Sequence, residues 1–158
     1  MASERSWHSG MAKYGGIVTQ TTMASISIRL AQADEGPLVG RLVRLYGGPQ
    51  WDWLDWSQVY PYWLIGEVAG MPRGTIMAAP GVPFGRMECL CVDPTLPHRQ
   101  KALLVRQLSY AGIASCQQMG SQAVFSTIDK SYASWNHIAQ ARGWMPMDEG
   151  TLLVKRVI

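Results

Sequence analysis

Residues 87–104 read MECLCVDPTLPHRQKALL, the pattern of a strand that runs through a short connection into a helix. Apolar residues continue to Val92, two prolines end the extended segment, and an apolar helical stripe begins at Leu104. Between them, HRQK at 98–101 makes the first helical turn positive. Such a helix start typically holds an anion, because its first amides lack intrahelical partners and the helix dipole favours negative charge. The stretch therefore predicts an anion site where a strand meets a helix.

No glycine lies in this connection, since Gly85 and Gly112 are the nearest on either side. A glycine normally lets an anion approach the backbone closely. Without one, His98, Arg99 and Lys101 would contact a phosphate through their side chains, at longer and less constrained distances. The alternative interpretation is a solvated, positively charged turn that binds nothing.

The sequence on both sides predicts an α/β fold with a mixed sheet. An alternating strand comes first, and apolar residues after Pro37 then repeat at helical spacing up to a Gly-Gly-Pro stop. Three consecutive strands follow, after which helix and strand alternate, an order that favours helices on both faces of the sheet. The expected strands are 25–30, 62–68, 74–79, 86–92 and 123–128, the expected helices are 37–46, 102–119 and 132–142, and one or two closing strands are expected after Met145.

The composition is that of one globular domain. The chain has 158 residues, 47% hydrophobic and 16% charged, with a formal net charge of +3 and a pI near 8.9. This length supports a single core, and the weak charge does not favour nucleic acid, which requires a clustered basic face. No apolar run approaches the roughly 20 residues of a membrane span, and no signal-peptide pattern opens the chain. We expect a cytoplasmic protein without a membrane partner.

Residues 1–24 lack periodicity and are rich in Ser, Thr and Gly, so we expect a flexible N-terminal arm ahead of a domain at 25–158. Such an arm can bind a protein partner or a second copy of the chain. The three cysteines are an odd number at spacings that fit no zinc template, so we expect reduced thiols and no metal site. They are Cys89, Cys91 and Cys116.

Three segments in this order resemble the GCN5-related N-acetyltransferase (GNAT) superfamily: WLIGEVAGMPRGTIMAA at 63–79, MECLCVDPTLPHRQKALL at 87–104 and IAQARGWMP at 138–146. The resemblance extends from about Ser25 to the C-terminus. It implies a GNAT-like mixed, mostly antiparallel central sheet with helices on both faces. It also implies acetyl-CoA as cosubstrate and an amine as acceptor.

In that family the pantetheine arm of acetyl-CoA lies between splayed fourth and fifth strands, and the pyrophosphate binds amides at the start of the long helix. The family's loop has Arg or Gln, two residues, Gly, one residue, and Gly or Ala. Without insertions, this pattern falls on Pro97, Gln100 and Ala102. With two inserted residues, it falls on Arg99, Ala102 and Leu104, which keeps the charge; both alignments lack the glycine. The cofactor contacts implied by the resemblance are Leu90, Val92, His98, Arg99, Gln100, Lys101, Ala102, Leu103 and Leu104.

Members of the family often carry a general base on the fourth strand, a place that Glu88 occupies here. If that strand alternates, Glu88 shares one face with Leu90 and Val92, opposite Cys89 and Cys91. The structural alternative is that Glu88 forms a salt bridge, to Arg86 or to Arg73.

The donor to the leaving thiolate is commonly a Tyr four residues before the Gly-aromatic pair, where this chain has Ala139. Tyr132 is the candidate replacement, with Ser131, Ser134 and His137 as alternatives, and it can equally be a packing aromatic.

These features predict an acyl-CoA-dependent N-acetyltransferase with an unknown amine acceptor. The second hypothesis is a catalytically inactive GNAT-like protein used for binding or assembly, for example a phage virion component. A third uses Arg99, Lys101 and Arg106 as a nucleic-acid footprint, but three charges are too few to favour it.

Overall fold

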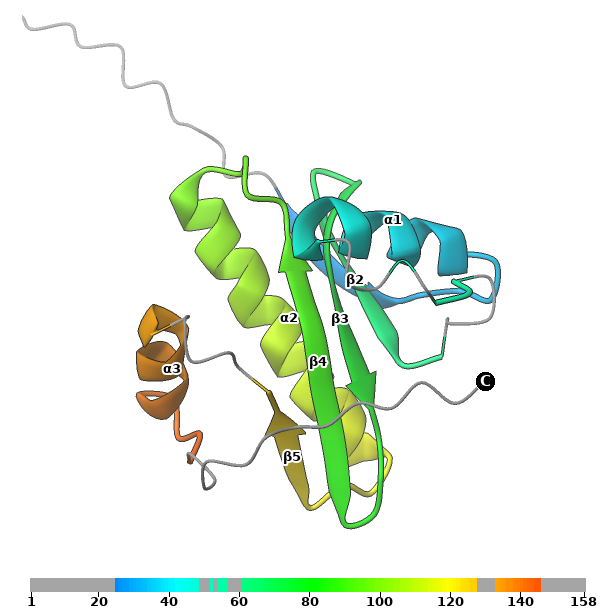
Figure 1. Ribbon diagram of the computed structural model, residues 1–158. Helices are drawn as coiled ribbons and strands as arrows, with labels where there is room; N and C mark the ends of the chain where they lie inside the picture. Colours follow the sequence, from blue (N-terminus) through cyan, green and yellow to red (C-terminus); the bar gives the residue numbers. More distant parts are fainter. Residues whose placement is uncertain (1–24, 49–51, 53, 57–60, 128–132, 146–158) are drawn as a thin grey trace, which may run out of the picture.

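A computed structural model gives the fold of the chain (Figure 1). The predicted N-terminal arm, the closing strands and the candidates Ser131 and Tyr132 lie outside the residues it describes. The described residues are 25–48, 52, 54–56, 61–127 and 133–145.

The sheet has five strands in the order β1-β2-β3-β4-β5. The first four pair antiparallel, and β5 joins β4 in parallel through a helical crossover. The prediction of a mixed, mostly antiparallel sheet is therefore confirmed. The strands are β1 (Ile26–Leu30), β2 (Trp63–Val68), β3 (Met71–Ala79), β4 (Phe84–Val92) and β5 (Ala123–Ser126).

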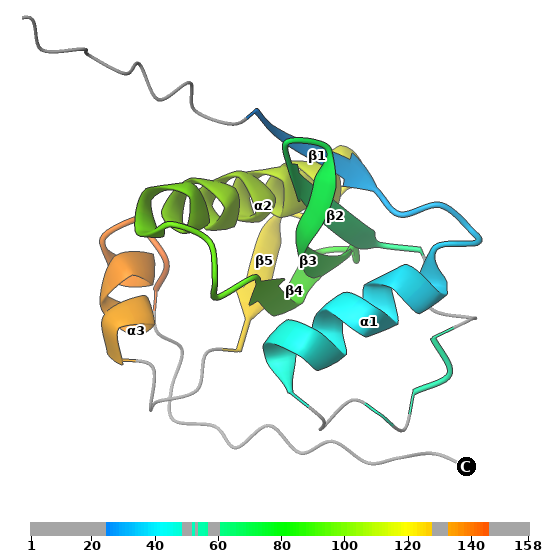
Figure 2. The ribbon, with the colours of Figure 1, turned by 90° about the horizontal axis from the view of Figure 1, so that it is seen from above.

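The two long helices cover opposite faces of this sheet, and a third lies at its side (Figure 2). They are α1 (Gly36–Gly47), α2 (His98–Gln118) and α3 (Ala133–Gln140). Helix α3 flanks α2 in both ribbon views. Helix α2 begins earlier than the predicted residue 102, because Pro97 takes the N-cap position, where no backbone N–H is required. No helix in the described part of the chain is long and apolar enough to cross a bilayer.

Two apolar clusters fill the spaces between the sheet and the long helices. The α2-side cluster contains Leu104 and Leu108, both fully buried. Gly66 permits this close packing, because a Cβ there would lie 2.6 Å from Cδ1 of Leu104. The α1-side cluster contains Trp56 and Trp63 in an edge-to-face contact, with ring centroids 5.5 Å apart.

A β-bulge divides β4 and changes which way its side chains face. Thr75 pairs with Cys91 and Met77 with Glu88, so two residues of β4 lie opposite the single residue Ile76. Cys89, one of the two, has a φ of +54°. The alternation therefore breaks at this point.

The bulge corrects the prediction that Glu88 shares a face with Leu90 and Val92. Glu88 lies opposite Met77, which packs in the α1-side cluster, whereas Leu90 and Val92 pack in the α2-side cluster. Cys89 remains on the α1 side. An extra residue on one strand shifts the period of 2 by one place, and regular alternation cannot anticipate it.

Candidate functional site

Strand β5 pairs with only the first part of β4. The parallel pairs run from Phe84 with Ala123 to Met87 with Ser126. Beyond them, residues 88–92 of β4 pair with β3 but have no pairing with β5, which ends well short of the end of β4 (Figure 1). We call residues 84–87 the paired half of β4 and residues 88–92 the open half.

Among the described residues, no strand pairs with the open half on the side away from β3, and we call this side its free edge. The Asp93 amide donates to the Arg73 carbonyl of the neighbouring chain segment, at 2.8 Å. Because successive residues of a strand direct their polar groups to opposite edges, Cys91 also bonds toward β3. Val92 then directs its N–H and C=O groups toward the edge that β5 has left, and Leu90, beside the bulge, has no partner residue on β3. These groups can bind an extended ligand with amides of its own.

The start of α2 presents a second set of unpaired donors. The first helical bond runs from the Lys101 amide to the Pro97 carbonyl, at 3.0 Å. The amides of residues 98–100 have no acceptor among the described residues. No side chain caps this end, and no acidic residue lies in its first turn. The helix start therefore has three free amides, the positive end of the helix dipole and no anion of its own.

Asp93 holds the connection between the open half and α2 in place. Its Oδ1 accepts hydrogen bonds from the Thr95 amide at 2.8 Å and the Thr95 hydroxyl at 2.6 Å. Its Oδ2 accepts from Arg73 at 2.7 Å. Burial acts to raise the pKa of Asp93, but the hydrogen bonds from Thr95, Arg73 and Tyr46 outweigh it, and the pKa lies below its ordinary value. Asp93 therefore stays ionised and fixes the turn that leads to the three free amides.

A pocket of about 490 Å³ lies along α2 next to these amides. We call it the arginine pocket, because three of its five lining residues are arginines and none is acidic. Arg142 comes from the turn after α3, and its Nη1 donates to the Tyr110 hydroxyl of α2 at 3.2 Å. The lining residues are Arg99, Ala102, Leu103, Arg106 and Arg142.

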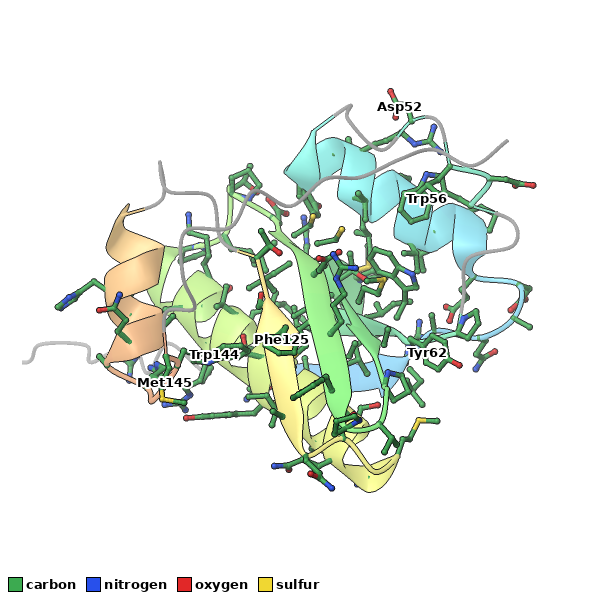
Figure 3. All side chains as sticks on the ribbon, turned by 60° about the horizontal axis from the view of Figure 1, so that its bottom comes forward. Asp52, Trp56, Tyr62, Phe125, Trp144 and Met145 are labelled. Atoms are coloured by element: carbon green, nitrogen blue, oxygen red, sulfur yellow. The ribbon has the colours of Figure 1, made fainter. Side chains whose placement is uncertain are left out.

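The turn after α3 is shaped by Gly143. Its φ of +85° allows the Trp144 amide to return to the Ala139 carbonyl at 3.2 Å, as in a Schellman C-cap. Trp144 then packs against the α2-side cluster (Figure 3). The predicted helix stop at Gly143 is confirmed, and the cap places Arg142 at the arginine pocket.

Glu88 is the first residue of β4 beyond the last β4–β5 pair. Its side chain is 16% exposed, and its Oε1 accepts a hydrogen bond from Arg86 Nε at 2.6 Å. The structural alternative, an ion pair with Arg86, is therefore present, whereas Arg73 pairs with Asp93. The carboxylate lies at the junction of the two halves, on the face of the sheet opposite α2.

The other predicted site residues fall into two groups. Arg99, Ala102 and Leu103 line the arginine pocket, and His98, Gln100 and Lys101 form the first turn of α2. Lys101 Nζ also bonds to the Pro94 carbonyl at 3.3 Å.

Leu104 is a correction, because its side chain is fully buried in the α2-side cluster and leaves no surface for a ligand. His137 lies exposed on α3. The first alignment of the cofactor loop, which begins at Pro97, is the one that covers the three free amides.

The thiols are not available as nucleophiles at neutral pH. Burial raises the pKa of Cys89 to about 12 and that of Cys91 to about 11, so both remain protonated. Among the described residues, no group of three or more His, Cys, Asp or Glu side chains is placed to hold a metal ion. The chemical groups described at the site are backbone amides, guanidinium groups and the two carboxylates of Glu88 and Asp93.

Sequence reasoning does not find the whole arginine pocket. From the sequence, Arg106 is a candidate only for nucleic-acid binding, and Arg142 is not a candidate site residue. The available signal is that Arg142 immediately precedes a helix-ending Gly143, but the contact with α2 arises from packing between elements that are far apart in sequence.

No protein-family model and no curated protein matches this chain. Solved structures do match it, at low identity. Aminoglycoside N-acetyltransferase AAC(6')-Iy in complex with CoA is 15% identical with a TM-score of 0.65, over 87% of this chain and 99% of that chain. N-acetylglutamate synthase from Neisseria gonorrhoeae, complexed with coenzyme A and L-arginine, is 20% identical with a TM-score of 0.64, over 83% of this chain and 30% of that chain. A GCN5-related N-acetyltransferase from Ralstonia eutropha JMP134 is 19% identical with a TM-score of 0.59, over 82% of this chain and 99% of that chain.

Proposed function

We propose that this chain, which has the fold of the GCN5-related N-acetyltransferases, transfers an acetyl group from acetyl-CoA to an amine. One observation carries the proposal: the free strand edge at Leu90 and Val92 and the free amides of residues 98–100 lie on either side of one short connection. A pantetheine amide fits the first set of groups, and a pyrophosphate fits the second. Acetyl-CoA contains both, joined in one molecule.

The missing glycine is compensated in this proposal by the shape of the helix start. Because the N-cap residue Pro97 has no side-chain oxygen to accept a hydrogen bond, the next three amides have no competing cap. Arg99 is exposed and Lys101 is half-buried, so two positive side chains lie in the same turn as the amides, next to the exposed His98. Charge-assisted contacts then add to the backbone contacts.

When bound, acetyl-CoA supplies an activated acyl carbon that an amine can attack. Glu88 would accept the proton that the attacking ammonium must lose, directly or through a water molecule. Its position on the α1 side of the junction separates this step from the phosphate contacts on the α2 side. Because Cys89 and Cys91 stay protonated, the residues present support direct transfer to the amine and not an acyl-enzyme.

The thiolate that leaves must gain a proton, and Tyr132 remains our proposed donor. It lies outside the described residues, so its role rests on the sequence alone. The described part of α3 leaves His137, whose side chain is exposed, as a further candidate. Substituting Tyr132→Phe should lower the turnover number and leave the affinity for acetyl-CoA unchanged.

The acceptor amine is not defined by the fold, since the matching structures carry the names of enzymes with different acceptors. Nothing in the described residues or the comparisons favours the alternative of an inactive assembly protein. In an assembly protein we would expect the site to be blocked by the N-terminal arm or by Leu104 and Gln100. Leu104 packs in the core, and the arm lies outside the described residues.

Calorimetric titration of the full chain with acetyl-CoA tests the proposal. We expect saturable binding that weakens when Arg99 and Lys101 are both replaced by Gln. Arg41→Gln is the matched control, because Arg41 is exposed on α1 and lines no part of the site. A panel of amines with a thiol-release assay then identifies the acceptor. Absence of binding at millimolar acetyl-CoA would refute the proposal.

A further inference from the structure

The arginine pocket extends well beyond the helix start that the proposed function uses. Arg99, Leu103, Arg106 and Tyr110 recur at helical spacing along α2, so they form one stripe. Arg142 approaches this stripe from the turn after α3 and is oriented by the Tyr110 hydroxyl. Two different elements thus bring guanidinium groups to the far end of one pocket.

These guanidinium groups have no counter-charge in the described structure. Arg106 and Arg142 form no ion pair with a described carboxylate, unlike Arg29, Arg73 and Arg86. Like charges gathered without an acid are unfavourable unless an anion joins them. The pocket therefore has the composition of a site for a strongly negative group.

The guanidinium groups of Arg106 and Arg142 lie farther along α2 than the amides at its start. Arg106 follows residues 98–100 by about two turns, which corresponds to about 10 Å along the axis at the helical rise of 1.5 Å per residue. A single phosphate cannot contact both ends. A ligand that satisfies both must carry two anionic groups, one at each end of a nucleoside-sized spacer.

We infer that Arg106 and Arg142 form a second anion site, which receives the phosphomonoester on the ribose of CoA and lets the protein distinguish CoA from dephospho-CoA. This inference rests on the proposed function, because it assumes that the pyrophosphate lies at the start of α2. A phosphomonoester carries nearly two negative charges at neutral pH and three acceptor oxygens, which suits two guanidinium groups from different directions.

The test compares three ligands by titration calorimetry on the full chain: CoA, dephospho-CoA and adenosine 3′,5′-bisphosphate. We expect the unsubstituted protein to bind CoA about tenfold more tightly than dephospho-CoA, a size appropriate to charge-assisted contacts that remain exposed to solvent. Arg106→Gln and Arg142→Gln should each remove most of this preference and leave dephospho-CoA binding unchanged. Because both arginines are exposed, we expect the variants to fold, as unchanged thermal unfolding would verify.

Arg41→Gln is the control for net charge, since it removes one positive charge outside the pocket and should keep the CoA preference. Tyr110→Phe tests orientation, because it removes the hydroxyl that accepts from Arg142. It should reduce the preference for CoA less than Arg142→Gln does, again without an effect on dephospho-CoA.

The outcomes separate the inference from the proposed function. Equal affinity of the unsubstituted protein for CoA and dephospho-CoA overturns the inference and leaves the proposed function standing. Binding of neither overturns the proposed function. In that case, arginine-dependent binding of adenosine 3′,5′-bisphosphate would still support the second anion site, and failure to bind it would overturn that site too.

Discussion

The two halves of β4 belong to one strand and have different surroundings. The paired half lies beside β5 along its whole length, its Arg86 and Met87 also pair with β3, and Met87 is buried in the α2-side cluster. The open half begins at the bulge, pairs with β3 alone among the described residues, and has the backbone of Leu90 and Val92 at its free edge. The paired half stabilises the sheet, whereas the open half has hydrogen-bonding groups to offer a ligand.

The difference comes from small local changes. One extra residue at Cys89 rotates the strand, and the early end of β5 removes its neighbour. Unpaired backbone groups at an edge are unfavourable unless water or a ligand satisfies them. A ligand that bonds to the open half would therefore satisfy backbone groups that have no protein partner there among the described residues. The following experiments test this difference between the two halves.

The largest expected effect is at the junction of the halves. Glu88→Gln should lower the turnover number by about 10²- to 10⁴-fold, the usual contribution of a general base. Acetyl-CoA affinity should not change, because Glu88 is on the face opposite the phosphate contacts.

Glu67→Gln is the matched control for this substitution. Glu67 is also half-buried and also paired with an arginine, with its Oε1 2.8 Å from Arg29 Nε, but it lies on β2. Steady-state kinetics on both variants decide the point. An equal turnover for Glu88→Gln and the unsubstituted protein would exclude Glu88 as the base.

A second pair of substitutions separates the core face of α2 from its pocket face. Leu104→Ala should lower the free energy of unfolding by about 2–5 kcal/mol, because it leaves a cavity against Gly66. Leu103→Ala, at the half-buried pocket residue, should lower it by about 1 kcal/mol or less. Urea unfolding measures both values. Similar losses would show that α2 does not pack on the sheet with the face described.

Two glycines with positive φ test whether the turn after α3 belongs to the site. Gly143 and Gly70 have φ of +85° and +75°, and a Cβ at either meets nothing within 4 Å. Each Gly→Ala change should therefore lower stability by about 1 kcal/mol through backbone strain alone. Only Gly143→Ala should also weaken CoA binding, since it disturbs the cap that places Arg142. Equal CoA affinity in the two variants would count against that placement.

The smallest effect concerns the connection between the open half and α2. The folded-state pKa of Asp93 lies below its ordinary value, so its stabilising contribution is present above about pH 4 and is lost as the pH falls through the folded-state pKa. Asp93→Asn should therefore be less stable than the unsubstituted protein at pH 7, and the difference should narrow below about pH 4. Chemical unfolding at several pH values measures this. A difference independent of pH would show that the charge of Asp93 does not matter.

Most of the architecture follows from patterns that the sequence displays. Alternation at Ile26, Ile28 and Leu30 predicts β1, and the helical stripe with Leu104 and Leu108 predicts α2, because these periods reflect which face is buried. The stop at Gly143 is likewise readable, since a positive φ suits glycine.

The details of the site depend on features without such a pattern. Glu88 was expected on the face of Leu90, but the bulge at Cys89 is a local departure from alternation. Arg142 reaches the arginine pocket because the turn after α3 packs beside α2, and no periodic pattern in the sequence predicts that contact. Leu104 falls on the last position of the cofactor loop in one of the two alignments, but its side chain is buried in the core.

Amide hydrogen exchange with and without CoA tests the central claim most directly, namely that the open half of β4 and the start of α2 together hold this ligand. CoA should slow exchange at the amides of Leu90, Val92 and residues 98–100, and should leave the paired half of β4 unchanged. CoA binding that leaves exchange at these five amides unaltered would contradict the account.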